Sequence, residues 1–217
     1  MNHDIDKIVK ILKNSSKDWI KPIVTEIALE GHDPFKILIS TIISLRTKDD
    51  VTRAASNRLF KIANNPLKIS ELTEEEIEKA IYPAGFYKNK AKTIKYLCRE
   101  LIDNYDSKVP DSIDELLKLN GVGRKTANLV VTQGYGLPGI CVDTHVHRIT
   151  NRLGYVITKN PVETEFALRE KLPPKYWIVI NDLLVAFGQN ICKPISPLCS
   201  QCLIHDECQR KGVVIHR

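Results

Sequence analysis

The segment from residue 33 to residue 47, DPFKILISTIISLRT, constrains the fold more than any other stretch of the sequence. Asp33 followed by Pro34 is a helix-start signal, and the residues after it are apolar on most sides of the expected helix. A helix without a polar face belongs in the middle of a core, where other elements surround it. The sequence therefore predicts a fold built around this segment.

The other segments also have helical patterns. Thr73 with Glu76, and Ser112 with Glu115, match the capping box that begins many helices. Two amphipathic segments follow between residues 161 and 190. The sequence has no convincing strand alternation bounded by tight turns, and the short runs GICVDT and GVVIH are interpreted as loop and tail. The fold class is predicted to be all-α.

The length of 217 residues allows one large domain or two small lobes. No apolar run is long enough to cross a bilayer, so no membrane partner is expected. The N-terminus has early acidic residues and no small-residue cleavage site, which argues against a signal or transit peptide. We therefore expect a cytoplasmic protein.

The net charge of +6 favours anionic partners only mildly. An acidic run at residues 74–78 is followed by a basic run within residues 85–99. A solvated helix face is the ordinary interpretation of both runs, and it is the better one for the acidic run. The basic run consists of Lys88, Lys90, Lys92, Lys95 and Arg99.

Four of the six cysteines lie near the C-terminus with the spacing C-x6-C-x2-C-x5-C. A disulfide framework is not expected in an intracellular chain of this size. Four thiolates suit zinc or an iron–sulfur cluster. Zinc sites usually contain two C-x2-C pairs and this segment has one, so the spacing favours a [4Fe-4S] cluster but leaves zinc open. The four residues are Cys192, Cys199, Cys202 and Cys208.

The segment LNGVGRKTANLV, residues 119–130, resembles a phosphate loop at first sight. A Walker loop needs glycine immediately before the lysine, after a strand; here Arg124 precedes Lys125 and the preceding segment is helical. The pattern instead indicates two helices joined by a Gly-Val-Gly turn, in which Gly121 and Gly123 are expected to adopt positive φ. Such a helix-hairpin-helix, with Val122 in the turn and Arg124 beside it, can bind one DNA backbone without reading bases.

Together, LNGVGRKTANLVV, VDTHVHRITNRLG and the cysteine spacing resemble the endonuclease III family of DNA glycosylases over nearly the whole chain. The resemblance implies a two-lobed helix-hairpin-helix glycosylase fold. Residues 27–137 would form a helical bundle containing the hairpin, and residues 1–26 with 138–217 a second helical lobe. The resemblance also implies a [4Fe-4S] cluster on the four cysteines.

In the family pattern, Lys125 is the nucleophile and Asp143 its acidic partner. A lysine attacks only as a neutral amine, and the positive end of a helix together with Arg124 disfavours the ammonium. The expected activity is removal of oxidised pyrimidines followed by β-elimination at the abasic site. Without the resemblance, Asp143 would be interpreted as a helix N-cap.

A flipped-out base leaves a gap in the stack that the protein must fill. By position, the family's wedge residues correspond to Leu45-Arg46 and Phe86, although relatives commonly carry a glutamine in the first loop. Phe86 could equally be a core residue. His145 is expected either to contact DNA or to pack between helices. Asn120 replaces a common proline, and a less rigid start of the turn is expected.

The partner implied by the resemblance is double-stranded DNA with damaged or abasic sites, bound by a monomer at the nucleoid. Two alternatives stay open: a glycosylase for mismatches such as G·T, and a non-catalytic iron–sulfur protein that binds DNA. Lys125 argues against the first alternative, and the presence of both Lys125 and Asp143 argues against the second.

Overall fold

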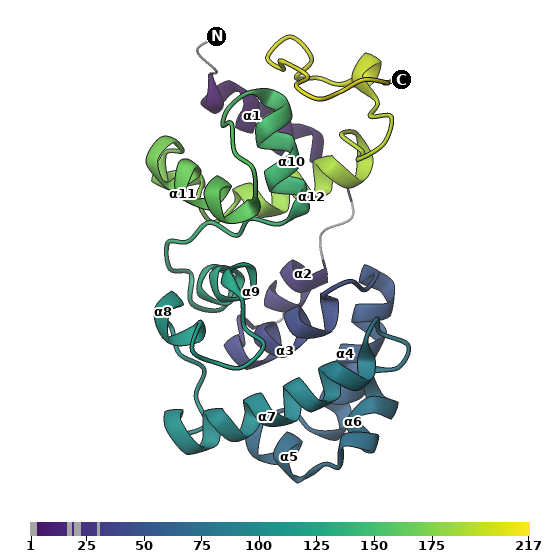
Figure 1. The fold of residues 1–217 in the computed structure, drawn as a ribbon, viewed down its shortest axis with the longest axis vertical. Coiled ribbons are helices and arrows are strands. Elements are labelled where there is room, and N and C mark those ends of the chain that lie inside the picture. The colour runs from purple at the N-terminus through teal and green to yellow at the C-terminus, as the bar shows by residue number, and fades with distance from the viewer. Residues whose placement is uncertain (1–3, 17–18, 20–22, 30) are drawn as a thin grey trace. The chain divides into compact units, whose positions relative to one another are not determined.

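The computed structural model describes residues 4–16, 19, 23–29 and 31–217, and in this part of the chain every regular element is a helix (Figure 1). The all-α prediction is confirmed. The chain divides into two compact units, Met1–Pro22 with Ile140–Arg217 and Ile23–Gly139. The sequence had placed these divisions at 26/27 and 137/138. Among the described residues, no helix combines the length and the apolar character that a membrane crossing requires.

The unit Ile23–Gly139 is organised around α3 (Pro34–Ser44). One carboxylate oxygen of Asp33 accepts hydrogen bonds from the backbone N–H groups of Phe35 and Lys36, which fixes the start of the helix. Helices pack around α3 on several sides: α2 (Ile23–Leu29), α4 (Asp49–Ile62), α7 (Tyr87–Tyr105) and α9 (Arg124–Leu129). As the apolar pattern predicts, α3 is the core helix of its unit, with Ile37, Leu38, Ile39 and Ile43 all fully buried.

The remaining helices of this unit pack against α7, form the first half of the hairpin or continue from α9. They are α5 (Pro66–Glu71), α6 (Glu74–Ile81), α8 (Ile113–Leu116) and the π-helical segment η2 (Val130–Gly134). The capping box of Thr73 and Glu76 forms with both of its hydrogen bonds. The second predicted box is wrong, because Ser112 precedes α8 without a side-chain cap and the Glu115 carboxylate instead accepts hydrogen bonds from Lys118 and Tyr105.

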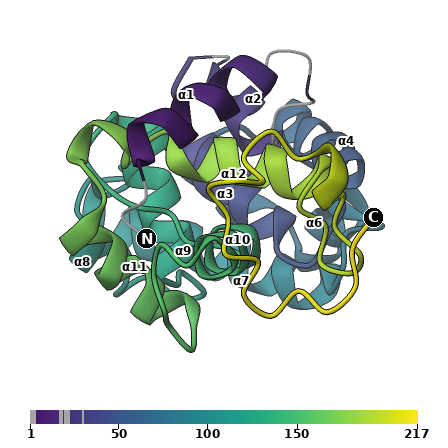
Figure 2. The same cartoon turned by 90° about the horizontal axis from the view of Figure 1, so that it is seen from above.

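The other unit combines the N-terminal helix with the C-terminal third of the chain. Its helices are α1 (Ile5–Ser15), α10 (Thr144–Leu153), α11 (Pro161–Lys171), the short η3 (Pro174–Tyr176) and α12 (Ile180–Asn190). α1 lies beside α12 (Figure 2), and Ile8, Val9 and Leu12 enter the same buried cluster as Leu184 and Phe187. Residues from opposite ends of the sequence therefore share one apolar core.

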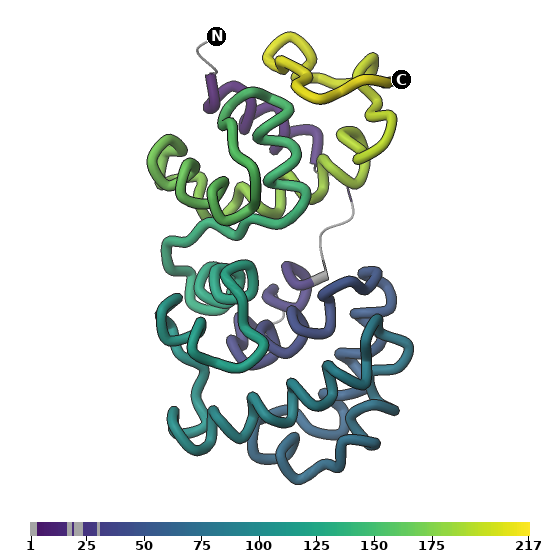
Figure 3. Tube along the Cα trace, in the orientation of Figure 1, coloured from purple at the N-terminus to yellow at the C-terminus, as the bar shows by residue number. Residues whose placement is uncertain are grey.

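After α12 the chain runs to its C-terminus with a single short helical turn, η4 (Cys199–Gln201), as Figure 3 shows. This stretch, residues 191–217, contains the four cysteines and is called the cysteine loop below. Its end is tied back to its beginning, since the backbone of Arg217 bonds to Ser200 and Pro197. The run GVVIH lies in this irregular tail, as expected.

We expect Leu38→Ala to lower the free energy of unfolding by about 2–5 kcal/mol, because it leaves a cavity in the centre of the core. Leu67→Ala is the matched control, since Leu67 of α5 is 53% exposed and Leu38 is fully buried. Urea unfolding followed by circular dichroism measures both. Equal losses for the two variants would contradict the central position of α3.

Candidate active site

The hairpin consists of α8, a tight turn and α9. Gly121 has a φ of +77°, and a Cβ at this position would overlap the Thr93 side chain of α7, so both conformation and space require glycine. Gly123 differs from the expectation. It is the N-cap of α9 with an extended φ of −97°, and open space surrounds the place where its Cβ would lie. The turn therefore needs positive φ at Gly121 and not at Gly123.

Apolar residues hold the hairpin against its unit. Leu116, Leu119 and Val122 are all buried. The backbone N–H of Asn120 donates to the Glu100 carboxylate of α7 at 2.9 Å. A proline has no N–H, so this bond exists because the residue before the glycines is asparagine. The start of the turn is therefore anchored to α7, where the sequence suggested only a loss of rigidity.

Arg124 and Lys125 occupy the first turn of α9, and both side chains are half-buried. The helix changes to π-helical geometry at Val130, one turn further on. Such segments occur frequently at functional sites. On the C-terminal side of Lys125 the chain is buried, from Thr126 and Ala127 to Val131.

Asp143 is the N-cap of α10. Its Oδ1 atom accepts hydrogen bonds from the backbone N–H groups of His145 and Val146, both at 2.9 Å. The side chain is half-buried. The N-cap interpretation of Asp143 is therefore confirmed. Because both capping bonds fall on Oδ1, the cap fixes the carboxylate without using its second oxygen.

His145 packs inside its own unit. A Cβ on Gly188 of α12 would overlap the His145 ring, and Nδ1 of that ring lies 3.1 Å from the Arg148 guanidinium. The ring therefore serves helix packing between α10 and α12. The DNA contact predicted for His145 stays a prediction.

The structure brings the two wedge candidates together. Arg46 follows the end of α3 and Phe86 is the N-cap of α7, and both residues have left-handed backbones with φ values of 53° and 58°. The Arg46 guanidinium lies over the Phe86 ring, 5.5 Å from its centre. Phe86 is 62% exposed, so the core alternative is wrong. Arg46 and Phe86 form one exposed cation–aromatic pair, here called the wedge pair.

Lys90 does not belong to the exposed basic face in which the sequence placed it. Its side chain is buried, and its ammonium donates to backbone carbonyls at the end of α3. Desolvation lowers the pKa of Lys90 to about 8. A sequence signal was present: Lys90 lies in helical register with Ile94, Leu97 and Leu101, the buried stripe of α7.

The four cysteines line one hollow in the unit that contains α10. Apolar residues of α10, α12 and the cysteine loop form most of the remaining wall, including Ile149, Leu153, Phe187 and Ile204. Burial raises the pKa of the Cys202 thiol to about 11 and also raises the pKa values of Cys199 and Cys208. Within the described ranges, no group of three or more His, Cys, Asp or Glu side chains is arranged to hold a single metal ion.

Arginines of α10 attach this helix to the cysteine loop. Arg148 donates to the Cys192 carbonyl at 2.8 Å. Arg152, one turn further, donates to the Lys193 and Pro194 carbonyls at 2.7 Å and lies 3.5 Å from the Cys192 sulfur. No local pattern in the sequence marks either arginine, because their partners lie about forty residues away.

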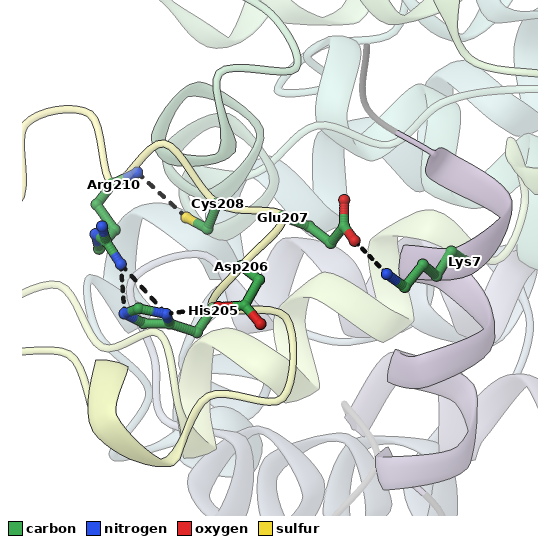
Figure 4. A network of polar contacts seen from close by, with 6 residues as sticks. All are labelled: Lys7, His205, Asp206, Glu207, Cys208 and Arg210. Atoms are coloured by element: carbon green, nitrogen blue, oxygen red, sulfur yellow. Dashed lines mark hydrogen bonds and ion pairs between the residues drawn. The ribbon is translucent and has the colours of Figure 1, made fainter. Parts of the chain in front are cut away.

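The far end of the cysteine loop is held in a similar way (Figure 4). Lys7 of α1 pairs with Glu207 at 2.5 Å, and the backbone N–H of Arg210 donates to the Cys208 sulfur at 3.4 Å. The Arg210 guanidinium contacts the His205 ring. The cysteines are therefore presented by a loop that is fixed at both ends.

Comparison with known proteins identifies the family of this chain. A family model described as HhH-GPD superfamily base excision DNA repair protein matches residues 39–174. Endonuclease III of Thermotoga maritima is 48% identical over 177 residues, which cover 82% of this chain and 83% of that relative. The chain belongs to the endonuclease III family.

Solved structures of the endonuclease III family share the fold. A non-covalent endonuclease III–DNA complex aligns with a TM-score of 0.85 and 35% identity, over 95% of this chain and 94% of the other. A trapped endonuclease III–DNA covalent intermediate aligns with a TM-score of 0.78 and 38% identity, over 82% and 84%. The protein is a base excision repair enzyme, a DNA glycosylase with abasic-site lyase activity.

The two hairpin glycines should respond differently to alanine. Gly121→Ala forces a side chain into a left-handed backbone and against Thr93, so we expect a loss of about 1–2 kcal/mol or more in unfolding free energy. Gly123→Ala is the matched control, with an expected change within about 0.5 kcal/mol. Urea unfolding measures both, and a large loss for Gly123→Ala would contradict the geometry of this turn.

Proposed function

We propose that the protein removes oxidised pyrimidines from double-stranded DNA and then cuts the abasic strand through a Schiff base on Lys125. The observation that supports this most directly is the position of Lys125, in the first turn of α9, immediately after the Gly-Val-Gly turn. We further propose that it works as a monomer on nucleoid DNA in the cytoplasm.

The hairpin would hold the DNA backbone near the lesion. The first N–H groups of α9 have no partners within the helix and form the positive end of its dipole. Open space at Gly123 lets a phosphate approach these groups closely, and Arg124 adds positive charge beside them. Contacts of this kind position DNA without selecting bases.

Lys125 would attack C1′ of the damaged nucleotide as a neutral amine. The C1′–N bond to the base breaks as the new C–N bond forms, and the base leaves with its electron pair. The attacking nitrogen gives its extra proton to the departing base, and cleavage of the C1′–O4′ bond, with a proton taken up by O4′, then gives a protonated Schiff base. This cation acidifies the C2′ proton, whose removal expels the 3′ phosphate and cuts the strand.

Asp143 would stabilise the positive charge that develops on the sugar during base loss. The cap on Oδ1 fixes the orientation of this carboxylate, and Oδ2 is the oxygen we assign to the sugar. Lys125 and Asp143 come from different compact units. Both residues lie within the range 39–174 that the family model matches, which supports their pairing.

The wedge pair would fill the gap left by the flipped nucleotide. The Phe86 ring is exposed and offers a face on which bases stack, and Arg46 offers donors to a base edge. A pair of this kind tolerates different opposite bases, because stacking does not depend on base identity. The alternative of a G·T mismatch enzyme is kept as an outcome of the assay below.

The cysteine loop fits a [4Fe-4S] cluster. Four thiols line one hollow with apolar walls, and the Arg152 guanidinium lies beside the Cys192 sulfur, where it would offset the negative charge of a thiolate-bound cluster. Cys192, Cys199, Cys202 and Cys208 would be the ligands. When bound, the cluster would cross-link the loop; no step of the reaction is assigned to it.

The cluster assignment predicts about four iron and four sulfide per chain and an iron–sulfur absorbance band in the purified protein. Cys202→Ala should lose most of both. Cys98→Ala is the matched control, because Cys98 is buried in α7, outside the cysteine loop, and should keep the cluster. A colourless protein that contains one zinc would contradict the assignment.

The chemistry predicts cleavage of a duplex with thymine glycol and of one with an abasic site, and none of a G·T mismatch. Borohydride should trap a covalent adduct with wild-type protein and none with Lys125→Ala. Asp143→Asn should keep the helix cap, since asparagine is also a good N-cap, and DNA binding, but lose about 10²–10³-fold in base release.

Three results would count against the proposal. An adduct formed by Lys125→Ala would place the nucleophile elsewhere. Cleavage confined to the G·T duplex would support the mismatch alternative. Binding without any cleavage would support a non-catalytic DNA-binding protein.

A further inference from the structure

We propose that Lys90 is a positioning residue that holds the wedge pair in the form that enters DNA. The proposal rests on the function proposed above for Arg46 and Phe86. Neither the family motifs nor the chemistry of Lys125 involves Lys90.

The ammonium of Lys90 is a three-pronged donor. It bonds to the Ile43 carbonyl at 2.6 Å, the Leu45 carbonyl at 2.5 Å and the Thr47 hydroxyl oxygen at 2.8 Å. The side chain is only 6% exposed. All three acceptors lie in the short stretch that includes Arg46, so one side chain fixes the backbone on both sides of that residue.

Two of these bonds complete the C-terminus of α3. The last carbonyls of a helix lack partners within it, and they carry the negative end of its dipole. The last turn of α3 contains no basic residue of its own. Lys90 supplies the missing cation from α7, and the chain then leaves α3 through Leu45 and the left-handed Arg46.

The third bond connects the two halves of the wedge. The Thr47 hydroxyl accepts from Lys90 and also from the backbone N–H of Gly85, at 3.0 Å. Gly85 lies so close to Arg46 that a Cβ would overlap the Arg46 carbonyl oxygen. The loop before Phe86 is therefore attached to the loop of Arg46 through Thr47, with Lys90 beneath both.

The arrangement holds strained backbone in place. Arg46 and Phe86 both have positive φ, a conformation that costs non-glycine residues free energy and persists only where the surroundings enforce it. The hydrogen bonds among Lys90, Thr47 and Gly85 enforce this conformation at Arg46 and Phe86.

Lysine is specifically required for this task. A neutral side chain would fill the same space without the cost of burying a charge, a cost visible in the pKa of Lys90, which desolvation lowers to about 8. Only an ammonium offers three N–H donors at one atom, which matches the three acceptors. The charge is therefore retained for its hydrogen bonds and not for packing.

Lys90→Met tests the proposal, because methionine fills similar space but donates no hydrogen bond. On a single-stranded abasic oligonucleotide, which needs no wedge, we expect lyase activity within about twofold of wild type. On a duplex with the same site we expect a loss of about ten- to a hundredfold, since misplaced binding groups cost this much. Lys92→Met is the matched control, because it removes the same charge from an exposed position of α7. Its rate on the duplex should fall much less than that of Lys90→Met.

A second variant and a second measurement secure the result. Thr47→Val keeps the Lys90 charge but removes the link to Gly85, and should show the same duplex-specific loss. In the Lys125→Ala background, fluorescence of 2-aminopurine beside an abasic site reports unstacking without any reaction. The signal should rise when the Lys125→Ala protein binds. The rise should be lost in the double variant that also carries Lys90→Met.

The outcomes separate this proposal from the chemistry. The role of Lys90 would be overturned if Lys90→Met lost activity equally on single-stranded and duplex substrates. It would also be overturned if Lys90→Met and Thr47→Val both kept wild-type duplex rates and wild-type unstacking. Wild-type protein inactive on both the single-stranded and the duplex abasic site would instead overturn the proposed chemistry of Lys125. The fluorescence arm would then still decide the role of Lys90, because it requires no cleavage.

Discussion

The burial of α3 on nearly all sides is the constraint on which its whole unit depends. A helix in that position cannot leave its last carbonyls to water, so another element must supply donors. α7 does so with Lys90, and this sets where α3 ends and how the chain turns into Arg46. The shape of an exposed loop thus follows from a hydrogen-bonding requirement inside the core. The need for donors at these carbonyls also explains why Lys90 is kept, although burying its charge is unfavourable.

In the other unit, α10 is the helix whose side chains satisfy the backbone groups of a neighbouring segment. Asp143 caps its first turn, while Arg148 and Arg152 bond to carbonyls at the start of the cysteine loop. A loop with little regular structure has many backbone groups to satisfy, and here side chains of one helix satisfy several of them. Anything that orders the cysteine loop therefore also steadies the helix that begins at Asp143. This gives the four cysteines a structural connection to the proposed chemistry without placing them in it.

Local patterns predicted much of this structure. The apolar run of α3, the Thr73 capping box, the hairpin and the grouping of four cysteines all follow from spacings of a few residues. One error concerns a group whose partners are distant in sequence, and another a group with a competing partner nearby. Lys90 was assigned to a solvated face because its acceptors lie 43 to 47 residues away, although its register with the apolar stripe was visible. Ser112 has capping-box spacing, yet Glu115 bonds to Lys118 and Tyr105 instead.

The residues assigned to function lie at the ends of helices and not on their faces. A helix end is where backbone groups remain unpaired and where side chains project at angles that a regular face cannot offer. Two of these regions are fixed by contacts with another element: at the hairpin Gly121 contacts Thr93 and Asn120 bonds to Glu100, and beside Arg46 the Leu45 carbonyl accepts from Lys90. α7 supplies all three contacts. Its buried stripe holds the unit together, and the polar residues beside that stripe position the turns that we propose to contact DNA, so one helix would couple the stability of the unit to recognition. The residues concerned are Arg46, Phe86, Lys125 and Asp143.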